Sequence, residues 1–264
     1  MIPYFRRNVY RYEILTLLVF ACYTAVEVTH MLLYIIRHGI PDYTTDTLTE
    51  KGWLQAEAVG KRIAASKIDR IYTSPMGRAK QTAEPACRLL GIEPIIEEWT
   101  REIDAEGYTT YPDGKRVSLC AMPNTLARGV DELDLPFSRS FECRAVAASG
   151  MKERYDDIKA HSDEFLERHG YREENGIYRI VKPNDEKVAV FCHALFGMTW
   201  ISQLLHIPFH MMWTSFCYSH TGVTIIEFAN NPDGITAPKL LTYCDLSHIY
   251  KENLPMLYDD WNPI

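Results

Sequence analysis

Three short stretches place side chains able to bind an anion directly after apolar runs. "LYIIRHG" ends in Arg37 and His38, "IYTSPMGRAK" carries Arg78, and "VAVFCHA" ends in His193 and an alanine. Arginine presents a planar set of donors that matches phosphoryl oxygens. A neutral imidazole has a nitrogen able to attack phosphorus. Two arginines and two histidines in this setting predict a pocket for a dianion such as a phosphoryl group.

The setting matters because the tripeptide Arg-His-Gly is a weak signal by itself. It occurs again at residues 168–170, where a predicted helix ends and a C-terminal cap explains it. Arg78 lies in the first turn of a predicted helix, whose free N–H groups also favour an anion. Ligands of open parallel sheets bind beyond the carboxyl ends of the strands, which is where Arg37, His38 and His193 are expected.

The elements that must position these residues alternate between strands and helices. We expect strands at residues 32–36, 67–74, 93–98, 186–193, 222–228 and 239–246. We expect helices at residues 48–66, 74–91 and 194–208. The run 32–36 is wholly apolar, as in a strand buried on both faces. This alternation predicts an α/β fold, a three-layer α/β/α arrangement with a mostly parallel central sheet.

Local signals set the expected ends of the helices. Thr49 can cap the first helix, and Ser74 can cap the second with Pro75 at its first position. Gly91 follows the end of the second helix, and Pro208 halts the third.

The segment 105–183 interrupts the alternation and is expected to be an insertion. It holds an amphipathic helix at 149–170, capped by Ser149, and the pair Asn175-Gly176 between two short strands, which predicts a hairpin. We interpret the insertion as a cap segment over the functional edge of the sheet. The alternative is a peripheral decoration.

Charge and cysteine content narrow the class of protein. The net charge is −7 and the pI about 5.7, which argues against general nucleic-acid binding. An anionic substrate must therefore be attracted by local positive charge. The seven cysteines are odd in number and form no C-x-x-C pair, so neither a disulfide framework nor a zinc site is expected, and a reducing, cytoplasmic location fits best. Cys192 precedes His193 on a strand and should point into the core.

Residues 1–30 combine a charged start with an apolar run of about thirteen residues, too short to span a bilayer. We favour an N-terminal extension, from a misassigned start codon, before a domain that spans 31–264. The alternatives are a signal or membrane anchor, which would export the protein or attach it to a membrane, and a helix packed on the domain.

Taken in order, these motifs resemble the histidine phosphatase superfamily, whose fold is phosphoglycerate-mutase-like. The resemblance covers most of residues 32–246 and rests on "RHG", "LTEKGWLQA", "YTSPMGRAKQTAEP", "REID" and "VAVFCHA". It implies that His38 is the nucleophile, phosphorylated during turnover, and that Glu102 is the proton donor and acceptor. It also implies that Arg37, Arg78 and His193 hold the phosphoryl oxygens.

The implied function is hydrolysis of a small phosphomonoester without a metal or other cofactor. Alternatives are mutase-type phosphotransfer and a non-catalytic protein that binds phosphorylated ligands. Glu102 has its own alternative, because Glu97, Glu98, Asp104 and Glu106 crowd the same segment, as on a solvated acidic face.

Two positions depart from the family pattern. Thr44 or Thr45 stands near the place of an asparagine, which puts contacts to the phosphate or leaving group in doubt. Ala194 replaces the usual glycine after the second histidine, and its backbone N–H is expected to bind phosphate.

Overall fold

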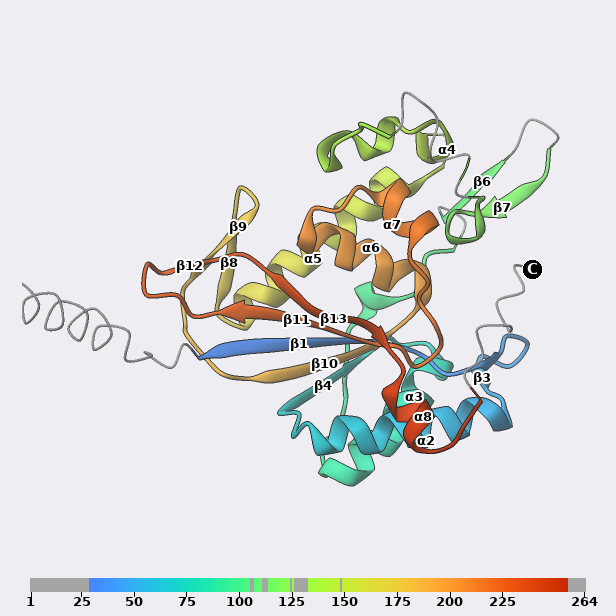
Figure 1. Ribbon diagram of the computed structural model, residues 1–264, viewed down its shortest axis with the longest axis vertical. Helices are drawn as coiled ribbons and strands as arrows, with labels where there is room; N and C mark the ends of the chain where they lie inside the picture. Colours follow the sequence, from blue (N-terminus) through green and yellow to red (C-terminus); the bar gives the residue numbers. More distant parts are fainter. Residues whose placement is uncertain are drawn as a thin grey trace, which may run out of the picture.

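The structure is a computed structural model that describes residues 29–255, apart from 105–106, 111–113, 124, 126–132 and 148. Its centre is a six-stranded sheet in the order β13-β11-β1-β10-β4-β5 (Figure 1). The strands are β1 (His30–Arg37), β4 (Arg70–Thr73), β5 (Ile95–Ile96), β10 (Lys187–Cys192), β11 (Val223–Ala229) and β13 (Lys239–Asp245). Only β11 runs against the other five, since it pairs antiparallel with both β1 and β13. The prediction of a mostly parallel sheet is confirmed.

Helices cover both faces of this sheet (Figure 1). One face carries α2 (Glu50–Ala65), α3 (Gly77–Leu90) and α8 (Ser247–Lys251). The other carries α5 (Met151–Arg168), α6 (Ala194–Leu205) and α7 (Phe209–Ser215). The arrangement is the expected three-layer α/β/α fold.

The apolar side chains of β1 pack into two hydrophobic clusters, one on each face of the sheet. Leu33 and Ile35 pack into the cluster on the α5 and α6 side, whereas Tyr34 and Ile36 pack into the cluster on the α2 and α3 side. Successive side chains of a strand point to opposite faces, so a strand between two helical layers must be apolar at every position. This requirement explains why the run before Arg37 shows no alternation.

The helix boundaries match the local signals in part. Thr49 caps α2, because its Oγ1 accepts from the N–H of Gly52 at 3.1 Å. Gly91 ends α3 with a left-handed φ of 69°. The expected start of α3 is wrong, because the helix begins at Gly77 with Met76 as its N-cap. The Ser74 Oγ accepts from the N–H of Met76 at 3.3 Å and also bonds to a histidine of the site described below.

Two further boundaries differ from expectation by a few residues. The N-cap of α5 is Gly150 rather than Ser149, although Ser149 Oγ accepts from the N–H of Met151 at 3.4 Å. Helix α6 ends before Pro208, because His206 already adopts a left-handed φ of 53°, and Pro208 becomes the N-cap of α7.

The segment 105–183 contains β6 (Tyr108–Thr110), β7 (Arg116–Ser118), α4 (Arg144–Ala147), α5, β8 (Tyr171–Glu174) and β9 (Ile177–Ile180). Among the described residues, the short 3₁₀ helices η1 (Glu98–Thr100), η3 (Leu119–Ala121) and η5 (Phe137–Glu142) lie before or within it. The predicted hairpin is confirmed, with positive φ at Asn175 and Gly176. Since α5 buries Ile158 and Phe165 in the main core, this part of the segment belongs to a layer of the fold.

Three short strands complete the described elements: β2 (Pro41–Asp42), β3 (Thr47–Leu48) and β12 (Ile235–Thr236). Residues 1–28 lie outside the described part, and the predictions made for them stay predictions. The first described residues already belong to the fold, since His30 begins β1 and pairs with Ala229. In the part of the chain that the structure describes, no helix is both long and apolar enough to cross a bilayer.

Candidate active site

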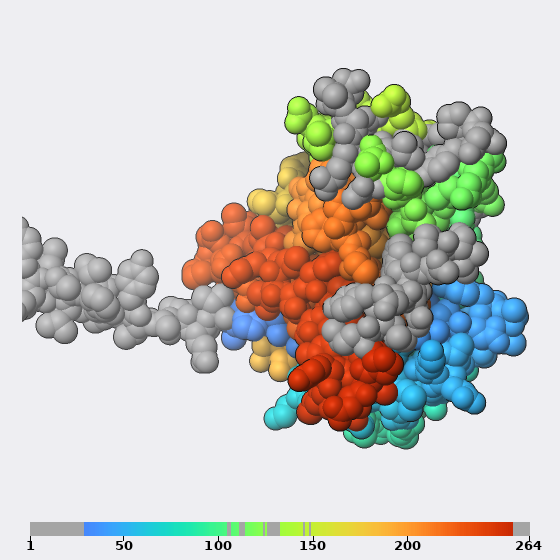
Figure 2. All heavy atoms as spheres, turned by 45° about the vertical axis from the view of Figure 1, so that its right-hand side comes forward, coloured from blue at the N-terminus to red at the C-terminus, as the bar shows by residue number. Residues whose placement is uncertain are grey.

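The carboxyl ends of β1, β4 and β10 meet at one edge of the sheet, which we call the carboxyl edge. Arg37 ends β1 and His38 follows it, Ser74 follows β4, and His193 follows β10. The hairpin of β2 and β3 and the hairpin of β6 and β7 lie at this end of the molecule (Figures 1 and 2). The predicted site residues from three separate strands are thus brought together.

His38 is held as a neutral imidazole whose Nε2 is unprotonated. Its Nδ1 lies 2.7 Å from the carbonyl of Gly39, which only accepts, so Nδ1 carries the proton. Its Nε2 accepts from Nε of Arg78 at 3.2 Å. Burial lowers the pKa of His38 well below 6.5, and the neighbouring His193 and Arg37 lower it further. The lone pair of Nε2 therefore lies beside a guanidinium, where an anion would be held.

Gly39 is required by a close approach of two backbone segments. A Cβ at position 39 would lie 2.8 Å from the carbonyl oxygen of Gly52 in α2, and a Cβ at Gly52 would lie 2.2 Å from the carbonyl oxygen of Ile40. The N–H of Gly39 donates to Thr82 Oγ1 in α3 at 3.0 Å. Because Gly39 has no side chain, α2 and α3 can pack directly against its backbone, next to His38.

The two arginines are almost fully buried and each has protein partners. Arg37 donates through Nη1 to the carbonyl of Tyr218 at 2.5 Å and through Nη2 to His220 Nε2 at 3.0 Å. Arg78 donates through Nη1 to Asp46 at 2.5 Å. Among the described residues, Nε of Arg37 is buried and has no hydrogen-bond partner. Buried donors of this kind are normally satisfied, which fits an anion in the pocket.

His193 faces His38, with their ring centroids 5.2 Å apart. Its Nε2 lies 2.7 Å from Ser74 Oγ, and its buried Nδ1 has no partner within the described part of the chain. Burial lowers the pKa of His193 well below 6.5, with Arg78 and Arg37 as further causes. When Ser74 donates to Nε2, Nδ1 carries the proton and is a donor for a phosphoryl oxygen.

The carboxylate of Glu102 lies on the N-terminus of α6. It accepts from the N–H groups of Ala194 at 3.1 Å and Phe196 at 3.0 Å. A solvated acidic face does not describe this residue, although Glu98 and Asp104 nearby are exposed. In this structure the Ala194 N–H donates to Glu102, and its binding to phosphate stays a prediction.

Comparison with known proteins adds to this geometry. A family profile described as histidine phosphatase superfamily (branch 1) matches residues 33–115, which include Arg37, His38, Arg78 and Glu102. Over these residues the chain is similar to the histidine phosphatase superfamily. His193 lies beyond the matched residues, and its place in the site comes from the fold.

Curated relatives match this chain over short segments. A probable phosphoglycerate mutase (GpmB) of Photorhabdus laumondii is 35% identical over 27% of this chain and 37% of its own length. A putative phosphoserine phosphatase 2 of Hydrogenobacter thermophilus is 31% identical over 29% of this chain and 42% of its own length. The matched segment thus spans about two fifths of these relatives.

Solved structures share the fold over most of the chain. A phosphoserine phosphatase of Entamoeba histolytica, in complex with 3-phosphoglyceric acid, has a TM-score of 0.52 at 21% identity, covering 83% of this chain and 99% of its own. A protein titled mycobacterial hydrolase 2 has a TM-score of 0.57 at 17% identity, covering 84% and 95%. At these identities the likeness establishes the fold alone.

Two residues that the structure places at this site were missed from the sequence. His220 precedes β11, whose antiparallel direction brings its beginning to the carboxyl edge, and its ring lies 5.6 Å from that of His38. Asp46 lies in the turn between β2 and β3 and contacts Arg78 and the N–H of Gly77. The direction of β11 was the signal for His220, whereas nothing in the sequence around Asp46 indicated its partner.

The threonines singled out near this turn form hydrogen bonds within the hairpin of β2 and β3. Thr44 is exposed and bonds to Asp42, and Thr45 Oγ1 lies 2.6 Å from Thr47 Oγ1. Cys192 is fully buried, as expected, and burial raises its thiol pKa.

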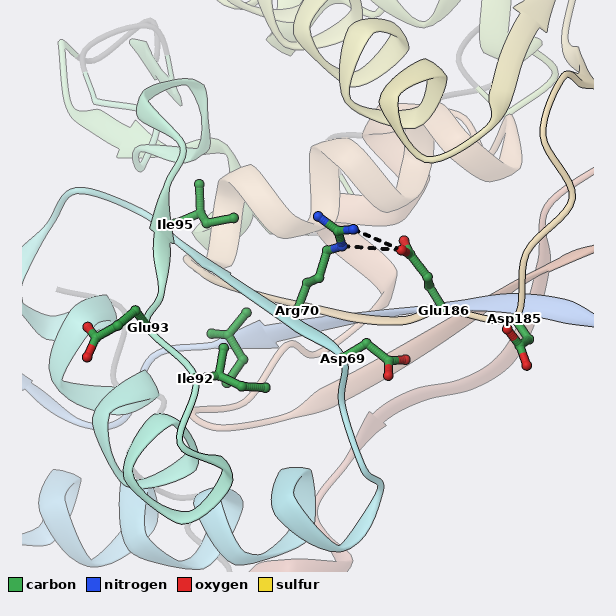
Figure 3. Close-up of a pocket in the computed structure, with 8 residues that line it drawn as sticks. Asp69, Arg70, Ile92, Glu93, Ile95, Asp185 and Glu186 are labelled. Atoms are coloured by element: carbon green, nitrogen blue, oxygen red, sulfur yellow. Dashed lines mark hydrogen bonds and ion pairs between the residues drawn. The ribbon is translucent and has the colours of Figure 1, made fainter.

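Among the described residues, two cavities are found whose walls do not include His38. One, of about 450 Å³, borders Glu102; its lining residues are Glu98, Trp99, Arg101, Glu102, Asp104, Arg154, Asp157 and His161. The other, of about 390 Å³, lies at the opposite edge of the sheet, where Arg70 pairs with Glu186 between Ile95 and Asp185 (Figure 3). None of the predicted site residues lines the second cavity.

Proposed function

We propose that this chain is a phosphatase that hydrolyses a small phosphomonoester through a phosphohistidine at His38. The observation that carries the proposal is the state of the imidazole. Its Nδ1 proton is fixed on the Gly39 carbonyl, and its Nε2 lone pair lies 3.2 Å from a guanidinium nitrogen of Arg78. A nucleophile beside a preorganised cation is what transfer of a phosphoryl group requires.

In the first step Nε2 of His38 attacks phosphorus and the bond from phosphorus to the alcohol oxygen breaks. Arg37, Arg78 and His193 stabilise the charge on the phosphoryl oxygens in the transition state. Protonated Glu102 gives its proton to the leaving alkoxide, so the products are phosphohistidine and the free alcohol.

In the second step a water molecule attacks the phosphohistidine. The Glu102 carboxylate takes a proton from this water, the bond from nitrogen to phosphorus breaks, and inorganic phosphate leaves. His38 returns to its neutral form with the proton on Nδ1. Because Arg37 and Arg78 supply the positive charge, we propose that no metal takes part.

Mutase activity is the second candidate, since the relatives named above include a probable phosphoglycerate mutase. The two functions differ in whether the phosphoryl group is passed to water or to another hydroxyl group of the substrate.

A panel of phosphomonoesters tests the proposal, with released phosphate measured with and without a chelator. We expect release that persists in the chelator and is lost in His38→Ala. A strict magnesium requirement, or isomerised products without free phosphate, would contradict the phosphatase.

A further inference from the structure

The loop before β11, residues 218–222, is hydrogen-bonded to Arg37 and His38 at the end of β1. The N–H of Thr221 donates to the carbonyls of Arg37 at 3.1 Å and His38 at 3.2 Å, and the N–H of Arg37 donates to Gly222 at 3.3 Å. Thr221 has a φ of 56°, which a β-branched residue rarely adopts. Residues in such conformations persist where their surroundings hold them, and they are concentrated at functional sites.

This loop provides both partners of the Arg37 guanidinium. Nη1 donates to the Tyr218 carbonyl and Nη2 to the His220 ring. Because a guanidinium only donates, Nε2 of His220 must be an unprotonated acceptor. The third nitrogen, Nε, is buried and without a partner among the described residues. The loop thus fixes two nitrogens and leaves the third for a ligand.

We propose that His220 is a positioning residue for Arg37, whose guanidinium it holds, through Nε2, in the orientation that binds the phosphoryl group. The inference rests on the proposed function, because the phosphoryl group is the ligand of that guanidinium. Without the acceptor, the long arginine side chain regains rotamers that turn Nε away from the pocket. Burial and the charge of Arg37 lower the pKa of His220 well below 6.5, so the acceptor is present at neutral pH.

Two substitutions of similar size separate the acceptor from the bulk of the ring. His220→Gln keeps an acceptor oxygen near the position of Nε2, and His220→Met has only a weakly accepting sulfur. The probe is inorganic phosphate, whose affinity is measured by calorimetry for the full chain. Both substitutions are also made in Arg37→Ala. His30→Met, at the other end of β1, is the control, and thermal unfolding verifies that each variant is folded.

We expect His220→Met to weaken phosphate binding by about 10-fold, as for a lost hydrogen bond to a charged group, and His220→Gln to stay within about 3-fold. In Arg37→Ala, His220→Met should change the affinity by less than about 2-fold, because there is no guanidinium to position.

Three results would overturn the positioning role. His220→Met could bind phosphate like the wild type, Gln and Met could weaken binding equally, or His220→Met could cause the same loss without Arg37. If the wild type binds phosphate but hydrolyses no phosphomonoester, the proposed function fails while the coupling between His220 and Arg37 stands. If the wild type binds no phosphate, both fail.

Discussion

At the scale of single residues, Glu102 has the most demanding role. Its carboxylate accepts from the N–H groups of Ala194, Phe196 and Ile103 in this structure. The proposed mechanism requires the same group to carry a proton when the alkoxide leaves. Its contribution should therefore depend on how much the leaving oxygen needs that proton.

Glu102→Gln preserves the shape of the side chain and removes proton transfer. We expect phosphorylation of His38 to slow by about 10²–10⁴-fold for an alkyl phosphate, whose alkoxide is a poor leaving group. With an aryl phosphate such as p-nitrophenyl phosphate, the rate of His38 phosphorylation should fall much less, since the phenolate leaves without a proton. Pre-steady-state measurement isolates this step from dephosphorylation.

The exposed neighbour Glu98 supplies the matched control, and Glu98→Gln should leave both rates unchanged. Equal losses for the two substrates in Glu102→Gln would remove Glu102 from the acid role and direct attention to Asp104.

The sequence identified the residues that directly follow parallel strands. Arg37, His38 and His193 are predictable because their position depends only on where an apolar run ends. Asp46 and His220 are less predictable. Asp46 reaches Arg78 from the turn between β2 and β3, and His220 reaches Arg37 from the loop before the antiparallel strand β11. Such contacts depend on how distant segments pack, which no local pattern encodes.

At the scale of elements, the packing of α2 and α3 on the end of β1 sets the position of His38. Gly39→Ala would place a methyl group 2.8 Å from the carbonyl oxygen of Gly52. Because backbone must move to relieve this contact, we expect a loss of about 1–3 kcal/mol in the free energy of unfolding. We also expect kcat/KM to fall, since the Gly39 carbonyl holds Nδ1 of His38.

Gly91→Ala is the matched control for this prediction. Gly91 ends α3 with a φ of 69° and open space around it, so alanine there should cost about 1–2 kcal/mol from backbone strain alone. Denaturant unfolding and steady-state kinetics at a temperature where both variants are folded make the comparison. If Gly39→Ala is as active as Gly91→Ala, the packing of α2 does not position His38.

The helix ends show where local signals succeed and fail. Thr49 and Gly91 act as predicted, because a cap is satisfied within a few residues of itself. Ser74 is not the N-cap, because α3 begins only at Gly77; its Oγ accepts from the N–H of Met76 at 3.3 Å and also bonds to the distant His193. A polar residue at a strand end thus has two possible roles, and only the tertiary structure decides between them.

At the scale of the whole molecule, the buried histidines couple stability to pH. The pKa values of His38 and His193 are lowered well below 6.5 by burial. Below pH 6.5 the unfolded chain binds protons at these sites that the folded chain does not, so stability falls as pH falls. Each such histidine contributes up to about 1.4 kcal/mol per pH unit.

Denaturant unfolding at pH 7.5, 6.5 and 5.5 measures this effect. We expect the free energy of unfolding to be nearly constant between the two higher values and lower at pH 5.5. His193→Asn, which has no titrating ring, should show a smaller drop. An equal drop in this variant would mean that His193 titrates alike in the folded and unfolded chains.

The three-layer fold was predictable as a whole. Its inner strands β1 and β10 are apolar at most positions, and its strands are separated in the sequence by amphipathic helices, which is typical of a buried parallel sheet. The role of residues 105–183 was not predictable, since α5 within that segment looks like any amphipathic helix and yet forms part of the core beside α6. Whether the remainder caps the pocket stays a prediction.

The measurement that tests the central claim most directly is to trap the phosphorylated intermediate during turnover. The full chain is mixed with a labelled phosphomonoester, quenched with base, which preserves phosphohistidine, and digested to locate the label by mass spectrometry. We predict an acid-labile phosphoryl group on His38, absent in His38→Ala and retained in the control His30→Ala. Label on any other residue, or turnover at the wild-type rate in His38→Ala, would contradict the account.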